Sequence, residues 1–408
     1  MSELMRRVDA VEPEIRAIWQ QLHQNPERGM ALPNTAKLIE AELLAKTGVE
    51  VHRVGEAGIW AVLRGGKPGG DDGVLMLRGD MDALPIQEAT DLPYASRSPG
   101  VMHACGHDVH ASSLLGAVRV LEQYRDQIPG EIWFFFQPGE EVLQGAKSFL
   151  ADPHIDFSRV RACAGCHVLG FTEVGKVSVR YGSHLASLDA LHFTVRGRGA
   201  HASTPNETVD AMVVAAELIM KLQVLLSREV NPSDMANLTL GYIRAGEPDR
   251  VGWVADRVEL GAGMRTVNPA TRTRLLERIQ AICDGLSLAT RAEIDFSYEN
   301  QCPALWNTPA LCDVAVRAVE HTLGAQAVEL APSPALGAED FAFYTQHFPG
   351  VFLSIGCRTP GRDSIPAHTP EFYTDPGTIR TCIAAYAAFA LEYFGVALDD
   401  TEGGSDTI

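Results

Sequence analysis

The spacing of apolar residues along the chain predicts alternating helices and strands. Apolar residues recur every three or four positions from 4 to 22, which is typical of an amphipathic helix. A second helix is expected from Asn34 and Thr35, whose side chains can cap it, to Gly48. Runs with the length of buried strands follow, at Val49–Val54, Ile59–Leu63, Val74–Leu77, Ile132–Phe136 and Val160–Ala164. A helical stretch at 111–124 separates two of them, which predicts an α/β domain with a mainly parallel sheet flanked by helices.

The pattern changes in the middle of the chain. Four segments alternate apolar and polar residues as strands with one buried face do, at 191–195, 238–242, 258–264 and 294–298. Helical stretches at 209–226 and 270–289 complete a β-α-β-β-α-β order, that of a split ferredoxin-like unit. We therefore predict a catalytic domain formed by residues 1–185 and 300–408, interrupted by an α+β domain formed by 186–299. The acidic tail from Asp399 is expected to be disordered.

Composition excludes several classes of protein. The 408 residues carry a formal net charge of −18, which opposes binding to nucleic acid or to an anionic membrane. No apolar run reaches 18 residues, and the polar N-terminus lacks the apolar core of a signal peptide. The eight cysteines are irregularly spaced, which favours reduced thiols over a disulfide framework. We expect a cytoplasmic protein without nucleic-acid or membrane partners.

Polar side chains follow the predicted strands, where α/β proteins bind their ligands. These residues are Cys105, His107, Glu140, Glu141, His167 and His368. The thiolate, the three imidazoles and one carboxylate of the Glu140-Glu141 pair make a plausible ligand set for borderline divalent metals. Five ligands exceed the needs of one tetrahedral ion and suit two ions roughly 3.5–4 Å apart, an arrangement that activates water and polarises a carbonyl.

Two acidic pairs have different expected tasks. Neighbouring side chains diverge in a turn, so one residue of the pair Glu140-Glu141 can bind metal while the other acts as general base. In the pair Asp80 and Asp82, Asp82 is suited to orient a ligand histidine through its other ring nitrogen. A turn or helix cap is the alternative role for these aspartates.

One competing motif and several missing ones narrow the choice. Cys163 to His167 match the C-x-x-C-H pattern of c-type haem attachment, but the segment lies in an apolar strand pattern and the chain shows no signal peptide. The G-x-S-x-G, H-E-x-x-H and Walker A signatures are absent. A metal-dependent hydrolase is favoured over haem carriers, serine hydrolases and nucleotide-dependent enzymes.

The motifs resemble those of the co-catalytic metallopeptidases of the aminoacylase and glutamate-carboxypeptidase group. The most similar branch is the amidohydrolases that include hippurate hydrolase, N-acyl-amino-acid deacylases and indole-acetyl-amino-acid hydrolases. The matching segments span nearly the whole chain, at Arg78–Pro85, Met102–Asp108, Gln137–Glu141, Gly199–His201, Gly337–Tyr344 and His368–Pro370. The resemblance implies a catalytic domain carrying a smaller lid or dimerisation domain.

The resemblance also assigns roles to individual residues. It implies two divalent ions, manganese or zinc with cobalt or nickel as further candidates, held by Cys105, His107, Glu141, His167 and His368. Glu140 takes the place of the general base and Asp82 that of a residue behind a metal ligand. His201, on the lid, takes the place of a histidine that steadies the oxyanion, often across a dimer. Arg265 follows a lid strand and is a candidate for binding a substrate carboxylate, or else a surface arginine.

Two departures concern the substrate side of the lid. The family usually has a second histidine near Asn206, and an asparagine near Gly252 before an Ile-Pro-Asp stretch that here reads Val254-Ala255-Asp256. The resemblance implies an amidohydrolase of N-acyl amino acids or related small amides, in a homodimer or higher oligomer. A dipeptidase with the same metals and a non-catalytic metal-binding protein are the alternatives. The acyl group and the amino acid are not predicted.

Overall fold

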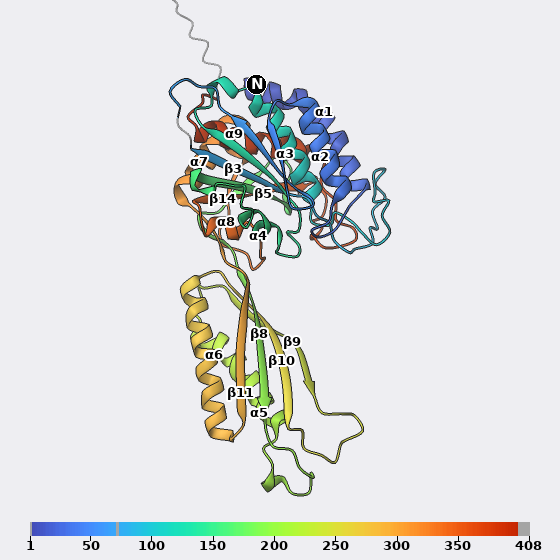
Figure 1. Ribbon diagram of the computed structural model, residues 1–408, viewed down its shortest axis with the longest axis vertical. Coiled ribbons are helices and arrows are strands. Elements are labelled where there is room, and N and C mark those ends of the chain that lie inside the picture. Colours follow the sequence, from blue (N-terminus) through green and yellow to red (C-terminus); the bar gives the residue numbers. More distant parts are fainter. Residues whose placement is uncertain (1, 71–72, 399–408) are drawn as a thin grey trace, which may run out of the picture. The chain divides into compact units, whose positions relative to one another are not determined.

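The computed structural model describes residues 2–70 and 73–398, so the predicted acidic tail lies outside the described residues. The chain divides into two compact units (Figure 1). The first unit consists of Met1–Gly182, Trp306–Pro332 and Phe343–Ile408, and the second of Ser183–Leu305 and Ser333–Ala342. The second unit thus includes residues 333–342, which the sequence analysis assigned to the catalytic domain.

The first unit contains most of the helices and one large sheet. Its helices are α1 (Glu3–Gln24), α2 (Pro33–Lys46), α3 (His107–Glu122), α4 (Gly145–Leu150), α7 (Pro309–Leu323), α8 (Ala342–Thr345) and α9 (Gly377–Tyr393). Its sheet strands are β1 (Glu50–Val54), β2 (Gly58–Arg64), β3 (Val74–Asp80), β4 (Glu131–Gln137), β5 (Val160–Glu173), β6 (Val177–Val179), β13 (Val328–Leu330) and β14 (Gly350–Arg358). The short strands β7 (Gly182–Leu185) and β12 (Leu305–Asn307) lie where the chain leaves and re-enters this unit.

The large sheet has the strand order β1-β2-β4-β3-β5-β14-β6-β13. The four strands β4, β3, β5 and β14 at its centre are parallel, whereas β1, β2 and the β14–β6 pair are antiparallel. In the parallel register Asp80 at the end of β3 stands opposite Gln137 at the end of β4. The carboxyl ends of these strands therefore meet at one edge of the sheet, and the predicted α/β fold class with a mainly parallel sheet is confirmed.

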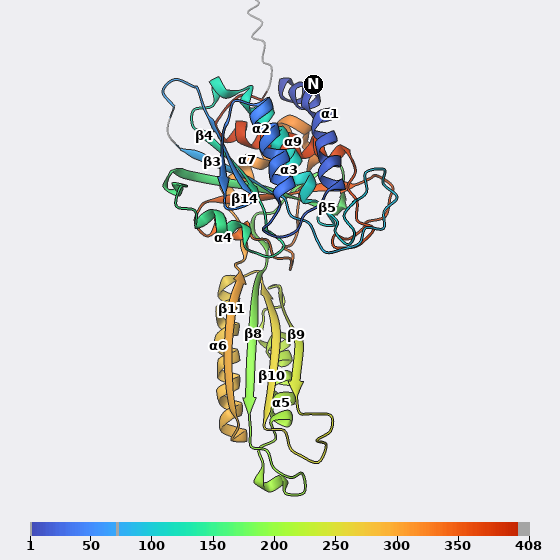
Figure 2. The ribbon, with the colours of Figure 1, turned by 45° about the vertical axis from the view of Figure 1, so that its right-hand side comes forward.

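Helices α1, α2, α3, α7 and α9 lie on one face of the large sheet, and α4 lies on the other (Figures 1 and 2). The central strands are mainly apolar because both of their faces are covered; every residue of β3 and β4 is buried, including the few polar ones at their ends. Helix α3 is likewise buried along nearly its whole length, between α1, α9 and the sheet. Its amino end therefore has a fixed position relative to the strand ends.

The start of α2 differs from the prediction. The helix begins at Pro33, and neither Asn34 nor Thr35 provides a side-chain cap. Instead the carboxylate of Glu27 accepts hydrogen bonds from the backbone N–H groups of Asn34, at 3.0 Å, and Thr35, at 2.8 Å. A carboxylate at this end is favoured because the first N–H groups of a helix lack partners within it.

The second unit is a four-stranded antiparallel sheet with two helices. Its elements are β8 (Ser187–Arg196), α5 (Ala211–Glu229), β9 (Ala236–Ala245), β10 (Arg257–Thr266), α6 (Pro269–Thr290) and β11 (Glu293–Cys302). The strand order is β11-β8-β10-β9, and α5 and α6 pack together on the sheet. Along β8 buried and more exposed residues alternate, with Leu191, Phe193 and Val195 in the core. The element order β-α-β-β-α-β is the predicted one.

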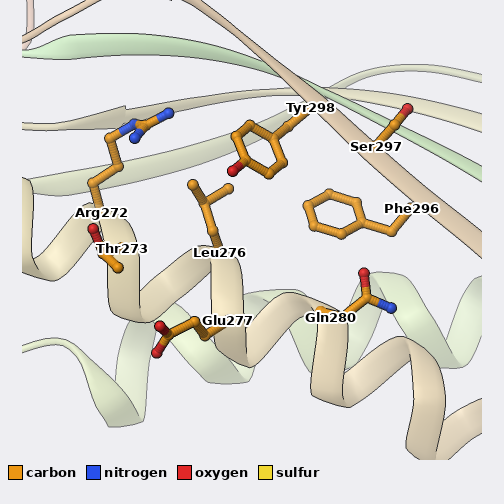
Figure 3. A pocket seen from close by; sticks show the side chains of 8 residues that line it. All are labelled: Arg272, Thr273, Leu276, Glu277, Gln280, Phe296, Ser297 and Tyr298. Atoms are coloured by element: carbon orange, nitrogen blue, oxygen red, sulfur yellow. The ribbon is translucent and has the colours of Figure 1, made fainter.

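A depression of about 540 Å³ lies between α6 and β11 in the second unit (Figure 3). Leu276 of α6 and the rings of Phe296 and Tyr298 of β11 form its apolar part. None of the predicted site residues lines this depression. Among the described residues of both units, no helix is long and apolar enough to cross a membrane.

Candidate metal centre

The predicted ligands of the first unit come from four loops and strands at one edge of the sheet. Cys105 precedes α3 and His107 opens it, Glu141 follows β4, and His368 lies between β14 and α9. His167 lies within β5 rather than after its end, because this strand continues to Glu173 and is longer than predicted. The structure brings the donor atoms of all five residues into overlapping groups, in each of which the atoms lie within 4.8 Å of one another.

Cys105 lies at the centre of one part of this cluster. Its Sγ is 3.1 Å from Nε2 of His167 and 3.3 Å from Nε2 of His368. The Nδ1 atom of His167 lies 2.6 Å from the carbonyl oxygen of Val168 and donates to it, so that Nε2 faces the thiol as an acceptor. This arrangement is typical of histidine ligands, whose second nitrogen is held by a hydrogen bond.

His368 is held in an unusual backbone conformation. Its φ of 65° lies in the left-handed region, which residues other than glycine rarely adopt. The strain is compensated by a hydrogen bond of 2.8 Å from its backbone N–H to the carbonyl of Ala104, beside Cys105. The imidazole then also lies near Glu141, with 3.4 Å between Nε2 and Oε1.

His107 completes the cluster from the first turn of α3. Its Nε2 lies 3.9 Å from Oε2 of Glu140 and 3.9 Å from Oε1 of Glu141. Nε2 of His107 and Oε1 of Glu141 are buried, and neither has a hydrogen-bond partner among the described residues. Buried polar atoms without hydrogen-bond partners are costly, and a cation bound among them removes that cost. The residues present therefore fit a divalent metal ion.

The Asp82 carboxylate organises the surroundings of these donors. It is fully buried, and its two oxygens accept hydrogen bonds from the backbone N–H groups of Glu140, at 3.0 Å, and Glu141, at 3.2 Å. The Oδ1 atom also lies 3.4 Å from Nδ1 of His107. One carboxylate thus holds both the turn after β4 and the ring of a candidate ligand.

Helix α3 begins where it does because of Gly106. This residue is the N-cap and has a φ of 87°, which glycine adopts without strain. A Cβ at this position would lie 2.4 Å from Cγ2 of Val168, so the backbone also approaches β5 too closely for any other residue. Cys105 and His107 are consequently held on either side of a tight turn against β5.

Burial and neighbouring charges shift the pKa values of several side chains in the cluster. Burial raises the pKa of the Cys105 thiol well above its usual range, and it lowers the pKa of His167 to about 3. Burial also opposes the charge of Glu141, but the nearby imidazoles of His368 and His107 lower the pKa of Glu141 overall. Since a metal ion needs a thiolate and neutral imidazoles, its binding is expected to release protons.

The structure adds a buried polar cluster that the sequence analysis missed. Asp80 lies 2.6 Å from Nδ1 of His110 through Oδ1, and Arg78 donates to its Oδ2. All three side chains are fully buried. His110 follows His107 by three residues, and this spacing, which puts both on one side of α3, was the available signal.

The other two predicted site residues lie in the second unit. His201 is exposed, and its Nδ1 accepts a hydrogen bond of 3.1 Å from the backbone N–H of Ser203. Gly252 accepts a backbone hydrogen bond from Ala202, so one of the segments that depart from the family lies beside His201. Arg265, on β10, donates to the carbonyl of Leu336 at 2.8 Å.

The C-x-x-C-H segment forms part of the sheet. Cys163 and Cys166 are buried within β5 and paired through its backbone with β3 or β14. Sγ of Cys166 lies 3.2 Å from Sγ of Cys382. Neither cysteine is exposed as thioether attachment requires.

Comparison with known proteins assigns the family. The model of peptidase family M20/M25/M40 matches residues 76–392, and the chain belongs to this family. It is 34% identical to an N-acetyl-L-cysteine deacetylase of Bacillus subtilis, over 97% of this chain and 91% of the relative. It is 32% identical to a hippurate hydrolase of Campylobacter jejuni, over 94% of this chain and 97% of the relative. Because the chain belongs to this family and its relatives are hydrolases, the chain is a metal-dependent hydrolase.

A solved structure supports the same assignment. A dinuclear metal-binding peptidase of the M20 family from Bacillus subtilis superposes with a TM-score of 0.82 at 26% identity, covering 95% of this chain and 100% of that one. The candidate ligand groups described above and this relative together support two divalent metal ions.

Replacing Asp82 by asparagine is expected to weaken metal binding. A single carbonyl oxygen cannot accept both backbone N–H groups, so the turn carrying Glu141 and the ring of His107 lose their common anchor. We expect metal dissociation constants about 10–100-fold higher, measured by competition with a chelator. Asp91→Asn, on an exposed loop, is the control. Native affinity in Asp82→Asn would contradict this role.

Proposed function

We propose that the chain is a metal-dependent amidohydrolase that cleaves the amide bond of N-acyl amino acids or related small amides. The observation that carries the proposal is the convergence of five candidate metal-binding side chains beside the further carboxylate of Glu140, with donor atoms of His107 and Glu141 buried and unpartnered among the described residues. The deacetylase and hippurate hydrolase among the relatives favour N-acyl amino acids as the substrate class.

Five residues are proposed to hold two divalent ions, namely Cys105, His107, Glu141, His167 and His368. When bound, such ions lower the pKa of coordinated water and polarise the scissile carbonyl. A thiolate and three imidazoles favour zinc by ligand softness, with manganese, cobalt and nickel as the other candidates. Ligand geometry and metal availability, more than affinity, decide which ion a site contains.

Glu140 is proposed as the general base. The residue is only 6% exposed, and its backbone N–H is held by Asp82. The carboxylate would take a proton from the attacking water and deliver it to the leaving nitrogen, since one group can serve as base and then as acid.

Two residues of the second unit are proposed to act on the substrate. Because Nδ1 of His201 accepts the N–H of Ser203, the neutral ring carries its proton on Nε2, where it can donate to an oxyanion. Arg265 uses one N–H for the carbonyl of Leu336 and has others to bind a carboxylate. The sequence departures near Asn206 and Gly252 concern the same loop region and leave the acyl group and amino acid open.

A homodimer is proposed from the surface of the second unit. Helix α5 exposes large apolar side chains at Val213, Met220 and Val224, and the edge strand β9 adds Tyr242 and Ile243. Exposed apolar patches of this kind mark interaction surfaces. A cytoplasmic location is proposed as well, since all eight cysteines are buried and free of disulfides.

Light scattering is expected to give the mass of a dimer for the native chain. Met220→Asp should shift it toward the monomer, because a charge would be buried in the interface. Lys221→Asp, an exposed charged position beside it, is the control. A monomeric native chain would remove the dimer and any role of His201 across it.

A substrate panel tests the proposed activity. Hippurate, other N-acyl amino acids and dipeptides are assayed with manganese, zinc, cobalt and nickel in turn. We expect N-acyl amino acids to give the highest kcat/KM. Faster hydrolysis of dipeptides would favour the dipeptidase alternative, and inactivity on every amide with metal bound would favour a non-catalytic metal-binding protein.

On the best substrate, Glu140→Gln is expected to lower kcat by about 10²–10⁴-fold, the usual contribution of a general base. Metal content and thermal stability should stay native, because Glu140 is not among the proposed ligands. Glu329→Gln, on exposed β13, controls for the loss of one charge. Native turnover in Glu140→Gln would refute the assignment of the base.

A further inference from the structure

The peptide groups around Val168, next to the candidate ligand His167, are held by two histidine side chains. The N–H of Val168 donates to Nε2 of His110 at 2.9 Å. Its carbonyl oxygen accepts from Nδ1 of His167 at 2.6 Å. The imidazole rings of His110 and His167 are in edge-to-face contact, with centroids 4.7 Å apart and planes at 62°.

Side chains bond the backbone of Val168 here because β3 no longer pairs with β5 at this position. The register between β3 and β5 ends with Arg78 opposite Gly165. Beyond this point β5 remains paired with β14, where Val168 stands opposite Ile355. His110 therefore supplies the acceptor for the Val168 N–H after the ladder with β3 has ended.

The bonding of His110 fixes its tautomer and its orientation. The backbone N–H of Val168 can only donate, so Nε2 of His110 is an acceptor and the proton resides on Nδ1. Nδ1 then donates to Oδ1 of Asp80, and Arg78 donates to the other oxygen of this carboxylate. These three side chains are fully buried, so solvent does not compete for the bonds.

Close packing keeps His110 within reach of both partners. A Cβ at Gly79 would lie 3.0 Å from the backbone oxygen of His110, so α3 packs closely on β3 at this position. On the other side, Gly106 packs directly against the side chain of Val168. The two glycines thus allow α3 to pack closely against both β3 and β5.

We propose that His110 is a positioning residue for the metal centre. It orients the ring of His167 by fixing the backbone on both sides of the Val168 Cα. This inference rests on the proposed function, in which His167 is a metal ligand. If the Val168 N–H loses its acceptor, the backbone can rotate and carry the carbonyl that holds Nδ1 of His167 away. The ring of His167, whose Nε2 lies 3.1 Å from Sγ of Cys105, is then no longer held in its orientation toward the thiol.

Two amide substitutions separate the two hydrogen bonds of His110. In His110→Gln the amide oxygen can reach the position of Nε2 and accept from Val168. In His110→Asn the shorter side chain reaches only the position of Nδ1, so the bond to Asp80 is kept and the bond to Val168 is lost. Leu115→Ala, buried on the same helix, controls for a general loss of stability.

The probe is Co²⁺ alone, titrated into each variant against a competing chelator, together with the visible absorption spectrum at saturation. We expect His110→Asn to raise one of two dissociation constants about 10–100-fold and to change the spectrum, and His110→Gln to stay within about threefold of native. Leu115→Ala should lower the melting temperature with native binding and spectrum. If His110→Asn does not fold, His110→Gln decides: near-native binding supports the proposal, and a loss of about tenfold or more overturns it.

Native constants and spectrum in His110→Asn would overturn the role of His110, as would equal losses in His110→Asn, His110→Gln and Leu115→Ala. These results differ from failure of the proposed function, in which the native chain itself would bind no Co²⁺. A native chain with two bound ions and an unaffected His110→Asn refutes the positioning role alone.

Discussion

The buried carboxylate of Asp82 is the interaction on which the rest of the centre depends. A charged group without solvent is costly unless partners surround it, and here two backbone N–H groups and an imidazole do so. Those partners belong to the turn after β4 and the first turn of α3. A single side chain just beyond β3 therefore fixes the relative positions of Glu140, Glu141 and His107, which no regular secondary structure would hold together.

Several other side chains of the centre have buried polar atoms whose interactions are unsatisfied without a cation. Nε2 of His107 and Oε1 of Glu141 are buried without a hydrogen-bond partner among the described residues, and the nearby Cys105 thiol resists ionisation because it is buried. A divalent cation satisfies these groups together, since it stabilises thiolate and carboxylate and competes with protons for imidazole. The same burial that is unfavourable for the ion-free protein strengthens the interactions once an ion is bound.

The sequence predicted the fold class and the element order because both depend on apolar periodicity, which the core enforces. It also predicted a metal-binding set, since such residue types rarely follow several apolar strands by chance. Contacts between segments that lie far apart in the sequence could not be predicted from apolar periodicity. Glu27 caps α2 from outside the helix, and His167 lies inside a strand that continues past the apolar run. The role of His110 depends on where the ladder between β3 and β5 ends. His201 and Arg265 belong to the second unit, so their relation to the metal centre stays a prediction.

Anomalous X-ray scattering from crystals of the cobalt- or zinc-loaded protein tests the central claim most directly. We predict two peaks, roughly 3.5–4 Å apart, between the side chains of Cys105, His107, Glu141, His167 and His368. Glu140 should lie beside the two ions, and neither Glu140 nor Asp82 should coordinate them. Peaks at another place in the first unit, or fully loaded protein with no ion among these five residues, would contradict it.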